Sequence, residues 1–341
     1  MGNMNAFRMS FPKTVEEAVS ELPRGRGLDE FTRTRVLAGG QDLLTEMKEH
    51  LVEPEKLVNL KGVEGLDEIR ELPDGGYEIG ALVKIADIAR YPGFTGAFAA
   101  IAEAAESVGS PQIRNAGTLG GNLCQRPRCW YYRSEDTFCM KKGGTECYSF
   151  AGENKYNAIL GGGPSYIVHP SDLAPALVCL GAEVVIAGPR GERIMELDRF
   201  FTLPSEGSIL RENVLRPEEL VLAVRVPAQP ANSKSTYLKF RERDSFDFAM
   251  GAVALRVEAD GGQIRSAGLC LGAVAPIPWR ALGAEEWLAG KPLERETFVG
   301  AGEPALAGAK PLSNNGYKIP LTRGLLVRAG ETLMARIQEG K

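Results

Sequence analysis

AGGQDL (residues 38–43) and NAGTLGGN (residues 115–122) are the two stretches that decide how this chain folds and what it binds. Neither contains the GxGxxG motif, which disfavours a Rossmann dinucleotide site. A glycine has no Cβ, so backbone N–H groups beside it can approach an anion closely. The first stretch also opens a helix-like segment, whose N-terminus carries unpaired N–H groups and a partial positive charge. The pair therefore predicts a pyrophosphate ligand that bridges two loops, with two ordinary tight turns as the alternative.

Around these loops, strand-like and helix-like segments alternate. We expect strands in TRVLAGG, KLVNL and YEIGALV, and helices in QDLLTEMKEH and GAFAAIAEAAESVG. IRNAGTLGGN is too rich in glycine and polar residues to predict either element. Residues 165–188 predict a strand, a helix capped by Ser171 and Asp172 and closed at Gly181, and a second strand.

A boundary is expected near residues 226–235, where Pro, Ser and Asn cluster. The segment after it predicts three antiparallel strands, two of them joined by the turn DGG, followed by helices in ALGAEEWLAG and in the C-terminal PLTRGLLVRAGETLMARIQEG. Strands followed by helices indicate a second unit of the α+β class.

Composition excludes several functions. With 341 residues, 44% hydrophobic and 25% charged, the chain has ordinary globular values, and a net charge of −4 gives no basis for binding nucleic acid. No apolar run approaches the roughly 18–20 residues that a membrane span needs. The N-terminus lacks the pattern of a signal peptide, so we expect a cytoplasmic protein with reduced cysteines. Of these, Cys179 and Cys270 are interpreted as core residues.

Several motifs in a fixed order carry a family resemblance. VLAGGQDLL, IRNAGTLGGNLC, HPSDLAPALVCLGAEV, YLKFRERDSFDFAMGAVAL and NNGYKIPL resemble the FAD-binding medium subunits of molybdenum hydroxylases, with Gln41 in place of the usual Thr. The resemblance implies an α+β fold, with a two-lobed FAD-binding domain of the PCMH or vanillyl-alcohol oxidase type followed by a smaller α+β domain. The implied boundaries are residues 1–228, with lobes at about 1–60 and 61–228 and a cysteine-rich insert at about 123–165, and then residues 233–341.

The same resemblance implies roles for individual residues. The first-loop residues expected around the pyrophosphate and the sugar side of FAD are Ala38, Gly39, Gly40, Gln41 and Asp42. The second-loop residues expected to hold the pyrophosphate are Thr118, Gly120, Gly121 and Asn122. Asp172 would accept a hydrogen bond from the cofactor, with helix capping as the alternative. Lys239 would place a cation near the reduced flavin ring, with a solvated strand lysine as the alternative. His169 is interpreted as a packed histidine, not a catalytic base.

Four cysteines, Cys124, Cys129, Cys139 and Cys147, lie close together in the insert. Their spacing, C-x4-C-x9-C-x7-C, lacks the CxxC pairs of common zinc sites, and four thiolates suit either zinc or an iron–sulfur cluster. The insert resembles that of 4-hydroxybenzoyl-CoA reductases and periplasmic-type aldehyde oxidoreductases, which implies a 4Fe–4S cluster with Cys129, Cys139 and Cys147 as ligands. Ser165 stands where those relatives have the fourth cysteine. We expect Cys124 to replace it, with Ser165, water or no cluster as alternatives.

The function implied is that of an electron-transfer flavoprotein subunit. It would work with a molybdopterin-binding large subunit and a 2Fe–2S small subunit, and would exchange electrons with ferredoxin or another carrier. One alternative is a stand-alone flavin oxidoreductase, which needs a convincing base over the flavin in a chain with two histidines. The other is a zinc- or cluster-bearing scaffold, which the two intact glycine loops disfavour.

Overall fold

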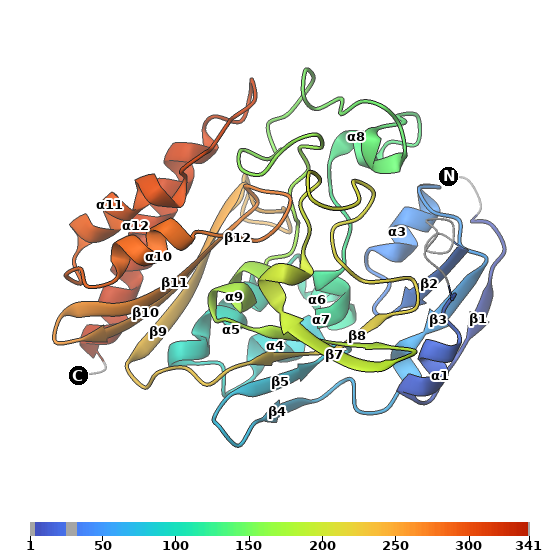
Figure 1. Cartoon of the computed structure of the whole chain (residues 1–341), viewed down its shortest axis with the longest axis horizontal. Coiled ribbons are helices and arrows are strands. Elements are labelled where there is room, and N and C mark those ends of the chain that lie inside the picture. Colours follow the sequence, from blue (N-terminus) through green and yellow to red (C-terminus); the bar gives the residue numbers. More distant parts are fainter. Residues whose placement is uncertain (1–3, 25–32, 340–341) are drawn as a thin grey trace.

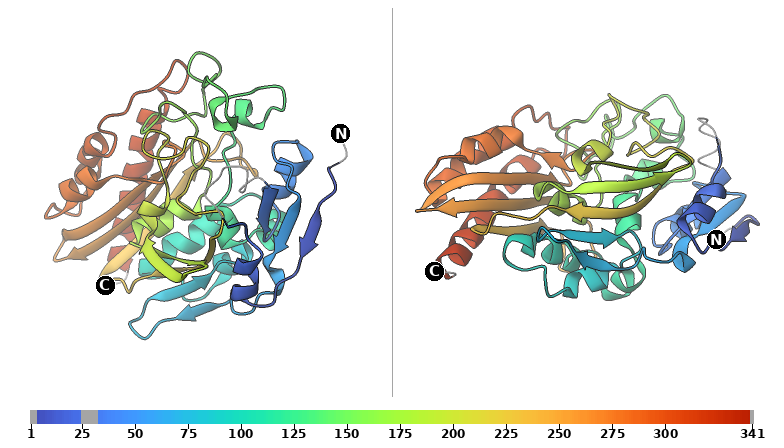
Figure 2. Two further views of the ribbon diagram at one scale, coloured as in Figure 1. Left: turned by 45° about the vertical axis from the view of Figure 1, so that its right-hand side comes forward. Right: turned by 60° about the horizontal axis from the view of Figure 1, so that its bottom comes forward.

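The computed structural model describes residues 4–24 and 33–339; residues 1–3, 25–32 and 340–341 of the predicted domain ranges lie outside it. Three β-sheets follow one another along the chain. Figure 2 shows the first sheet and the C-terminal helices at opposite ends of the molecule.

The first sheet is parallel, in the order β1–β3–β2. Its strands are β1 (Arg8–Ser10), β2 (Thr34–Leu37) and β3 (Lys56–Asn59), and its helices are α1 (Val15–Ser20) and α3 (Leu43–Lys48). Residues 38–42 form the turn from β2 into α3, so the first glycine loop leaves the end of a strand as predicted.

The second sheet has five strands in the order β4–β5–β8–β6–β7. The strands are β4 (Ile69–Glu71), β5 (Tyr77–Gly80), β6 (Glu183–Gly188), β7 (Gly191–Glu196) and β8 (Leu220–Val226). The helices between β5 and β6 are α4 (Ile85–Arg90), α5 (Ala99–Glu106), α6 (Pro111–Ala116), α7 (Leu119–Leu123), α8 (Trp130–Arg133) and α9 (Leu173–Cys179). Short 3-10 turns lie at Leu60–Gly62, Gly96–Phe98, Met140–Lys142 and Leu197–Phe200.

The third sheet is antiparallel and lies on the side of the second sheet that is away from the first (Figure 1). It contains β9 (Ser233–Phe240), β10 (Gly251–Asp260), β11 (Gln263–Gly272) and β12 (Trp279–Arg280), followed by α10 (Leu282–Leu288), α11 (Arg295–Ala305) and α12 (Lys318–Glu339). The predicted DGG turn joins β10 to β11, with positive φ at Gly261 and Gly262. Helices α10 and α12 pack on one face of this sheet, and α5 and α9 on the other. The mixed architecture confirms the predicted α+β fold.

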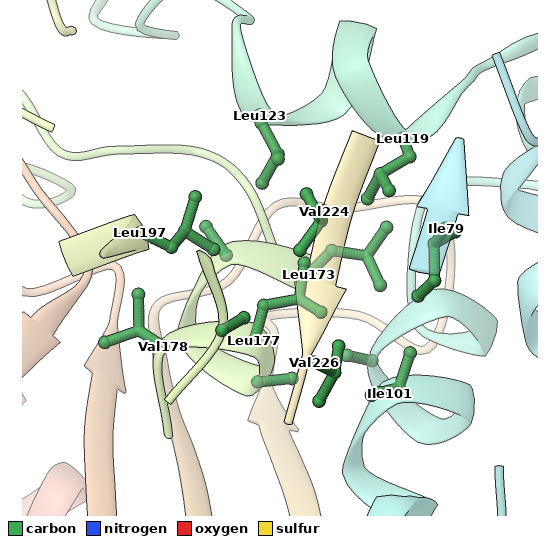
Figure 3. Close-up of a cluster of buried hydrophobic side chains, with 14 of the residues drawn as sticks. Ile79, Ile101, Leu119, Leu123, Leu173, Leu177, Val178, Leu197, Val224 and Val226 are labelled. Carbon is green, nitrogen blue, oxygen red and sulfur yellow. The ribbon is translucent and has the colours of Figure 1, made fainter. Parts of the chain in front are cut away.

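The hydrophobic core holds the second glycine stretch against α9 and the second sheet. Leu119 and Leu123 of α7 are fully buried with Leu173 and Leu177 of α9 and Val224 of β8 (Figure 3). Two buried leucine side chains contribute about 3–6 kcal/mol of burial free energy. The loop that carries Gly120 and Gly121 is therefore anchored in the core by the leucines that flank these glycines.

Two predictions of local structure were wrong. Residues 113–122 are largely helical, because Ser110 and Thr118 each accept a backbone hydrogen bond that caps a short helix, α6 or α7. Capping outweighs the poor helix propensity of the glycines. Residues 165–170 are extended but form no strand, since their backbone bonds go to the loops at Ala158 and Ala275. Within the described ranges, no helix has the length and apolar character to cross a bilayer.

Candidate functional site

One large cavity, of about 680 Å³, lies between the first sheet, the second sheet and the insert. Its walls include every residue predicted from the two loops, together with the two residues predicted to contact other parts of the cofactor, Asp172 and Lys239. These are Ala38, Gly39, Gly40, Gln41, Asp42, Thr118, Gly120, Gly121, Asn122, Asp172 and Lys239. Segments separated by about 200 positions in the sequence, from Ala38 to Lys239, thus line one cavity. Their contacts with a cofactor stay predictions.

The two glycine loops touch each other. A Cβ on Gly39 would lie 2.1 Å from the carbonyl oxygen of Ala116, so only glycine permits this close approach. Gly40 has a φ of +74°, a left-handed conformation that favours glycine. The residue type at both positions is therefore fixed by backbone geometry.

The second loop presents backbone to the cavity. Gly120 is buried against Ala81, whereas Gly121 is exposed, and a Cβ there would meet only the Thr118 hydroxyl within 4 Å, at 3.1 Å. The Asn122 side chain is turned into the protein, where its Oδ1 accepts a hydrogen bond from the Ser171 hydroxyl. That contact ties the second loop to the start of α9.

Asp172 and Lys239 form a buried ion pair. The Lys239 ammonium donates to Asp172 Oδ2 at 2.7 Å and to the Ser107 carbonyl at 3.1 Å. The Tyr237 hydroxyl donates to Asp172 Oδ1 at 2.7 Å, and burial raises the pKa of Tyr237 well above its usual value. The Asp172 side chain makes no cap hydrogen bond to α9. The hydroxyl of Ser171 caps this helix instead, accepting a hydrogen bond from the Ala174 N–H. Asp172 is therefore not a helix cap, and Lys239 is not a solvated strand lysine, so both alternative interpretations are wrong. Tyr237 had no signal in the sequence beyond its place two residues before Lys239.

The same cavity contains groups that the sequence did not single out. Arg35, His50, Arg126, Arg128, Arg211 and Glu212 all line it. Arg126 and Glu212 form an ion pair at 2.6 Å, and although burial disfavours the charged carboxyl, Arg126 and Lys141 lower the pKa of Glu212. His50 hydrogen-bonds Glu53 through Nδ1 at 3.0 Å. Most of these residues come from the insert and the 210–212 loop. No local sequence pattern predicts that these two segments contact each other.

His169 lies in a second, smaller cavity of about 280 Å³ that shares Asp172 with the first. It is 3% exposed and packs edge-on against Phe201. Burial lowers the pKa of His169 to about 4, so the ring is neutral at pH 7. The packed-histidine interpretation agrees with this environment.

The four insert cysteines do not form one group. Cys124 lines the large cavity, where burial raises the pKa of its thiol to about 12. Cys129 lines the smaller cavity and contacts Asn157 Nδ2 at 3.8 Å, and burial raises its pKa as well. Cys139 is buried, and Cys147 contacts the Ser149 hydroxyl at 3.1 Å.

Across residues 4–24 and 33–339, no three His, Cys, Asp or Glu side chains are arranged to hold a metal ion. Ser165 is 1% exposed, and its hydroxyl has no hydrogen-bond partner among these residues. The 4Fe–4S cluster and its ligand set therefore stay predictions without structural support.

Comparison with known proteins agrees with the geometry. Residues 5–229 match the family described as the FAD binding domain in molybdopterin dehydrogenase, and residues 235–333 match the CO dehydrogenase flavoprotein C-terminal domain. The chain is an FAD-binding subunit of the molybdenum hydroxylase family. This subunit is 33% identical over 326 residues to the aldehyde oxidoreductase FAD-binding subunit PaoB of Escherichia coli strain K12, covering 95% of this chain and 96% of that protein.

Two further relatives extend over the whole FAD-binding subunit. The carbon monoxide dehydrogenase medium chain of Hydrogenophaga pseudoflava is 28% identical over 335 residues, covering 97% of this chain and 98% of its own length. The solved CO dehydrogenase from Oligotropha carboxidovorans superimposes with a TM-score of 0.76 at 26% identity, covering 98% of this chain and 100% of that one. These relatives are oxidoreductase subunits, so the predicted enzyme class is confirmed.

FAD fits the walls of the large cavity. Glycines without Cβ atoms form both facing loops, the volume suits a cofactor-sized ligand, and Asp172 with Lys239 supplies polar groups at one side.

Proposed function

We propose that this subunit relays electrons between the 2Fe–2S clusters of a partner subunit and an external acceptor or donor, within a complex that contains a molybdopterin-binding large subunit. The observation that carries the proposal is that both glycine loops, Asp172 and Lys239 line one cavity. A ferredoxin-like carrier as the external partner and a cytoplasmic location remain predictions. The names of the relatives, an FAD-binding subunit and a medium chain, support assembly with other subunits.

The role of the chain is to bind and orient the cofactor. Bound FAD supplies the ability to exchange electrons singly or in pairs, which the protein itself lacks. The glycines let main-chain N–H groups reach the phosphates, with Gly39 setting how closely the loops approach. An ammonium has three N–H donors, and Lys239 uses two of them on Asp172 and Ser107, which leaves one for the cofactor. Because Asp172 offsets its charge, Lys239 contributes a directed hydrogen bond more than a free positive charge.

A stand-alone flavin oxidoreductase is less well supported. Such an enzyme needs a base over the flavin. The described residues include two histidines: His50, which lines the large cavity and hydrogen-bonds Glu53, and His169, which lines the smaller cavity. Burial lowers the pKa of His169 to about 4 and its ring packs on Phe201, so it would be a weak base. We therefore assign the substrate chemistry to another subunit.

The test is reconstitution. The native protein should co-purify with two other subunits in equal amounts, and substrate should reduce its FAD only when both are present. Removing the large subunit should stop reduction by substrate while leaving FAD bound. Reduction of FAD by an organic substrate with the isolated chain would contradict the relay and favour the stand-alone enzyme.

The 4Fe–4S cluster is a separate proposal with its own test. Iron and acid-labile sulfide would be measured on the isolated chain purified without oxygen. About four of each per chain would support the cluster, and zinc without sulfide would reject it. Ser165→Cys should raise the iron content if position 165 completes the ligand set, and leave it unchanged otherwise.

A further inference from the structure

Asp42 stands at the N-cap of α3, where an aspartate usually caps the helix with its own side chain. Here it makes no cap hydrogen bond. Its Oδ2 accepts from the Arg126 backbone N–H at 2.6 Å, and its Oδ1 accepts from the Arg133 guanidinium at 2.8 Å. The Arg128 guanidinium also donates to Oδ1. The carboxylate of the first glycine loop is therefore held by the insert and not by its own helix.

A second contact joins the same two segments one helical turn later. Glu46 of α3 is fully buried, and its Oε1 accepts from the Tyr132 hydroxyl at 2.7 Å. The guanidinium groups of Arg126 and Arg133 lie over the Tyr132 ring, 5.1 Å and 5.4 Å from its centroid. The segment 126–133 is thus fixed along α3 by an aromatic group as well as by charge.

The insert also reaches the opposite wall of the cavity. Arg126 donates to the Leu210 carbonyl at 2.9 Å and pairs with Glu212, which in turn pairs with Lys141. Residues 126–141 therefore connect α3 with the 210–212 loop. Asp42, Arg126, Arg128, Tyr132, Lys141 and Glu212 all line the large cavity.

The position of Asp42 raises an electrostatic problem for an anionic ligand. Its side chain is 15% exposed and lies next to Gln41 and Gly40, where the pyrophosphate is expected. Burial would raise the pKa of Asp42, but the attraction of Arg128 and Arg133 outweighs it and lowers the pKa. Asp42 is thus ionised at neutral pH, and its charge would repel a pyrophosphate unless these cations neutralise it.

We propose that Arg128 and Arg133 of the insert are positioning residues for FAD: they neutralise Asp42 and hold the first glycine loop in the shape that accepts the pyrophosphate. The inference rests on the FAD site proposed above and is independent of any metal in the insert. It gives the insert a direct part in cofactor binding through its arginines.

The experiment compares FAD affinity in four proteins by equilibrium titration: wild type, Arg128→Gln/Arg133→Gln, Asp42→Asn and the triple variant. The double variant should bind FAD roughly tenfold or more weakly, because the buried Asp42 carboxylate loses both guanidinium partners beside an anion. The triple variant should recover most of that loss, since the unpaired charge is gone. A purely structural role of the arginines would leave the triple variant as weak as the double.

A pH series adds a second readout. The charged groups around Asp42 are Arg126, Arg128 and Arg133 from the insert and Glu46 and Glu49 from α3. In the double variant, FAD affinity should rise as the pH falls from 8 to 5, because protonation removes the Asp42 charge. Asp42→Asn in the same background should abolish that rise.

Lys155→Gln/Arg199→Gln is the matched control, because it removes two cations that pair with exposed carboxylates, Glu242 and Glu196, away from Asp42. It should bind FAD as wild type does. Arg128→Gln alone, with Arg133 still on Asp42, should give a smaller loss that Asp42→Asn reverses, and it keeps the test open if the double variant does not fold. Unchanged affinity in the arginine variants, or no rescue by Asp42→Asn, would overturn this inference alone. No FAD binding by the wild type would overturn the proposed site with it.

Discussion

The glycine-loop cavity and the cysteine insert lie against each other, yet the structure brings together only one of the two sets of residues that the sequence predicted. Each of the eleven residues predicted for the cofactor site lines the same cavity. The four cysteines predicted for a cluster are placed differently: Cys124 lines that cavity, Cys129 lines a smaller one, Cys139 is buried and Cys147 is half-buried. The difference comes from what holds each group in place.

In the loops, the backbone itself sets the geometry. Gly39 approaches Ala116, Gly40 needs a positive φ, and Leu119 and Leu123 anchor the second loop in the core. The residues that meet these requirements are grouped in two short motifs, so the sequence shows them even though the two loops lie far apart along the chain. A metal site instead requires side chains from an irregular segment to converge, and residues 124–172 contain only α8 and one 3-10 turn. Cysteine spacing does not determine that convergence.

The largest effect is expected where the two loops touch. In Gly39→Val, the added Cβ would overlap the Ala116 carbonyl oxygen, so the loops must separate. We expect loss of FAD binding and a decrease of about 1–3 kcal/mol in the free energy of unfolding. Cofactor content and denaturant unfolding would measure both. Gly324→Val, in α12 with no atom within 4 Å of its added Cβ, is the control. Wild-type FAD content in Gly39→Val would show that loop contact is irrelevant to the site.

Gly121→Val separates binding from stability. The added side chain meets only the Thr118 hydroxyl and otherwise projects from an exposed position on the cavity wall. FAD affinity should fall by more than tenfold, while the free energy of unfolding of the apoprotein changes by less than about 1 kcal/mol. Retention of FAD would place the phosphates elsewhere in the cavity.

Lys318, the first residue of α12, is expected to have a smaller effect, on the pH dependence of stability. It is fully buried, donates to the carbonyls of Tyr156 and Ala273, and burial lowers its pKa to about 7. Above pH 7 the unfolded state, with an ordinary lysine pKa near ~10.4, binds one more proton than the folded state. Stability should therefore rise from pH 7 to pH 8, by up to about 1.4 kcal/mol from this group.

The Lys318→Met variant should lose that part of the slope, because it has no ammonium to protonate in the unfolded state. Denaturant unfolding at the two pH values measures the slope in both proteins, and every other titrating group is common to them. Equal slopes would mean that Lys318 keeps its charge in the folded protein.

The smallest effect is expected for Cys124→Ser, which should leave the iron content of the protein unchanged. Because Cys124 lines the large cavity, any iron that the insert holds should be independent of it. Iron and sulfide content equal to wild type would agree with this placement. A loss of iron would instead support the expectation that Cys124 is the fourth ligand, and would require residues 124–147 to rearrange around a cluster.

Much of the fold was readable because periodicity and turn chemistry act locally: β2, β3, α5, α10, α12 and the DGG turn all follow such patterns. The helices α6 and α7 were missed because capping by Ser110 and Thr118 outweighs glycine content. In the site, Tyr237 and the arginines on Asp42 could not be predicted, since each depends on a contact across 65 or more positions. The division into domains near residues 228–233 stays a prediction.

The central claim is that two touching glycine loops bind a pyrophosphate. Equilibrium titration of the purified apoprotein with FAD and, in parallel, with FMN tests it most directly, because FMN has a single phosphate. We expect one FAD per chain, bound at least about tenfold more tightly than FMN. Equal affinity for the two flavins, or no binding of either, would contradict the account.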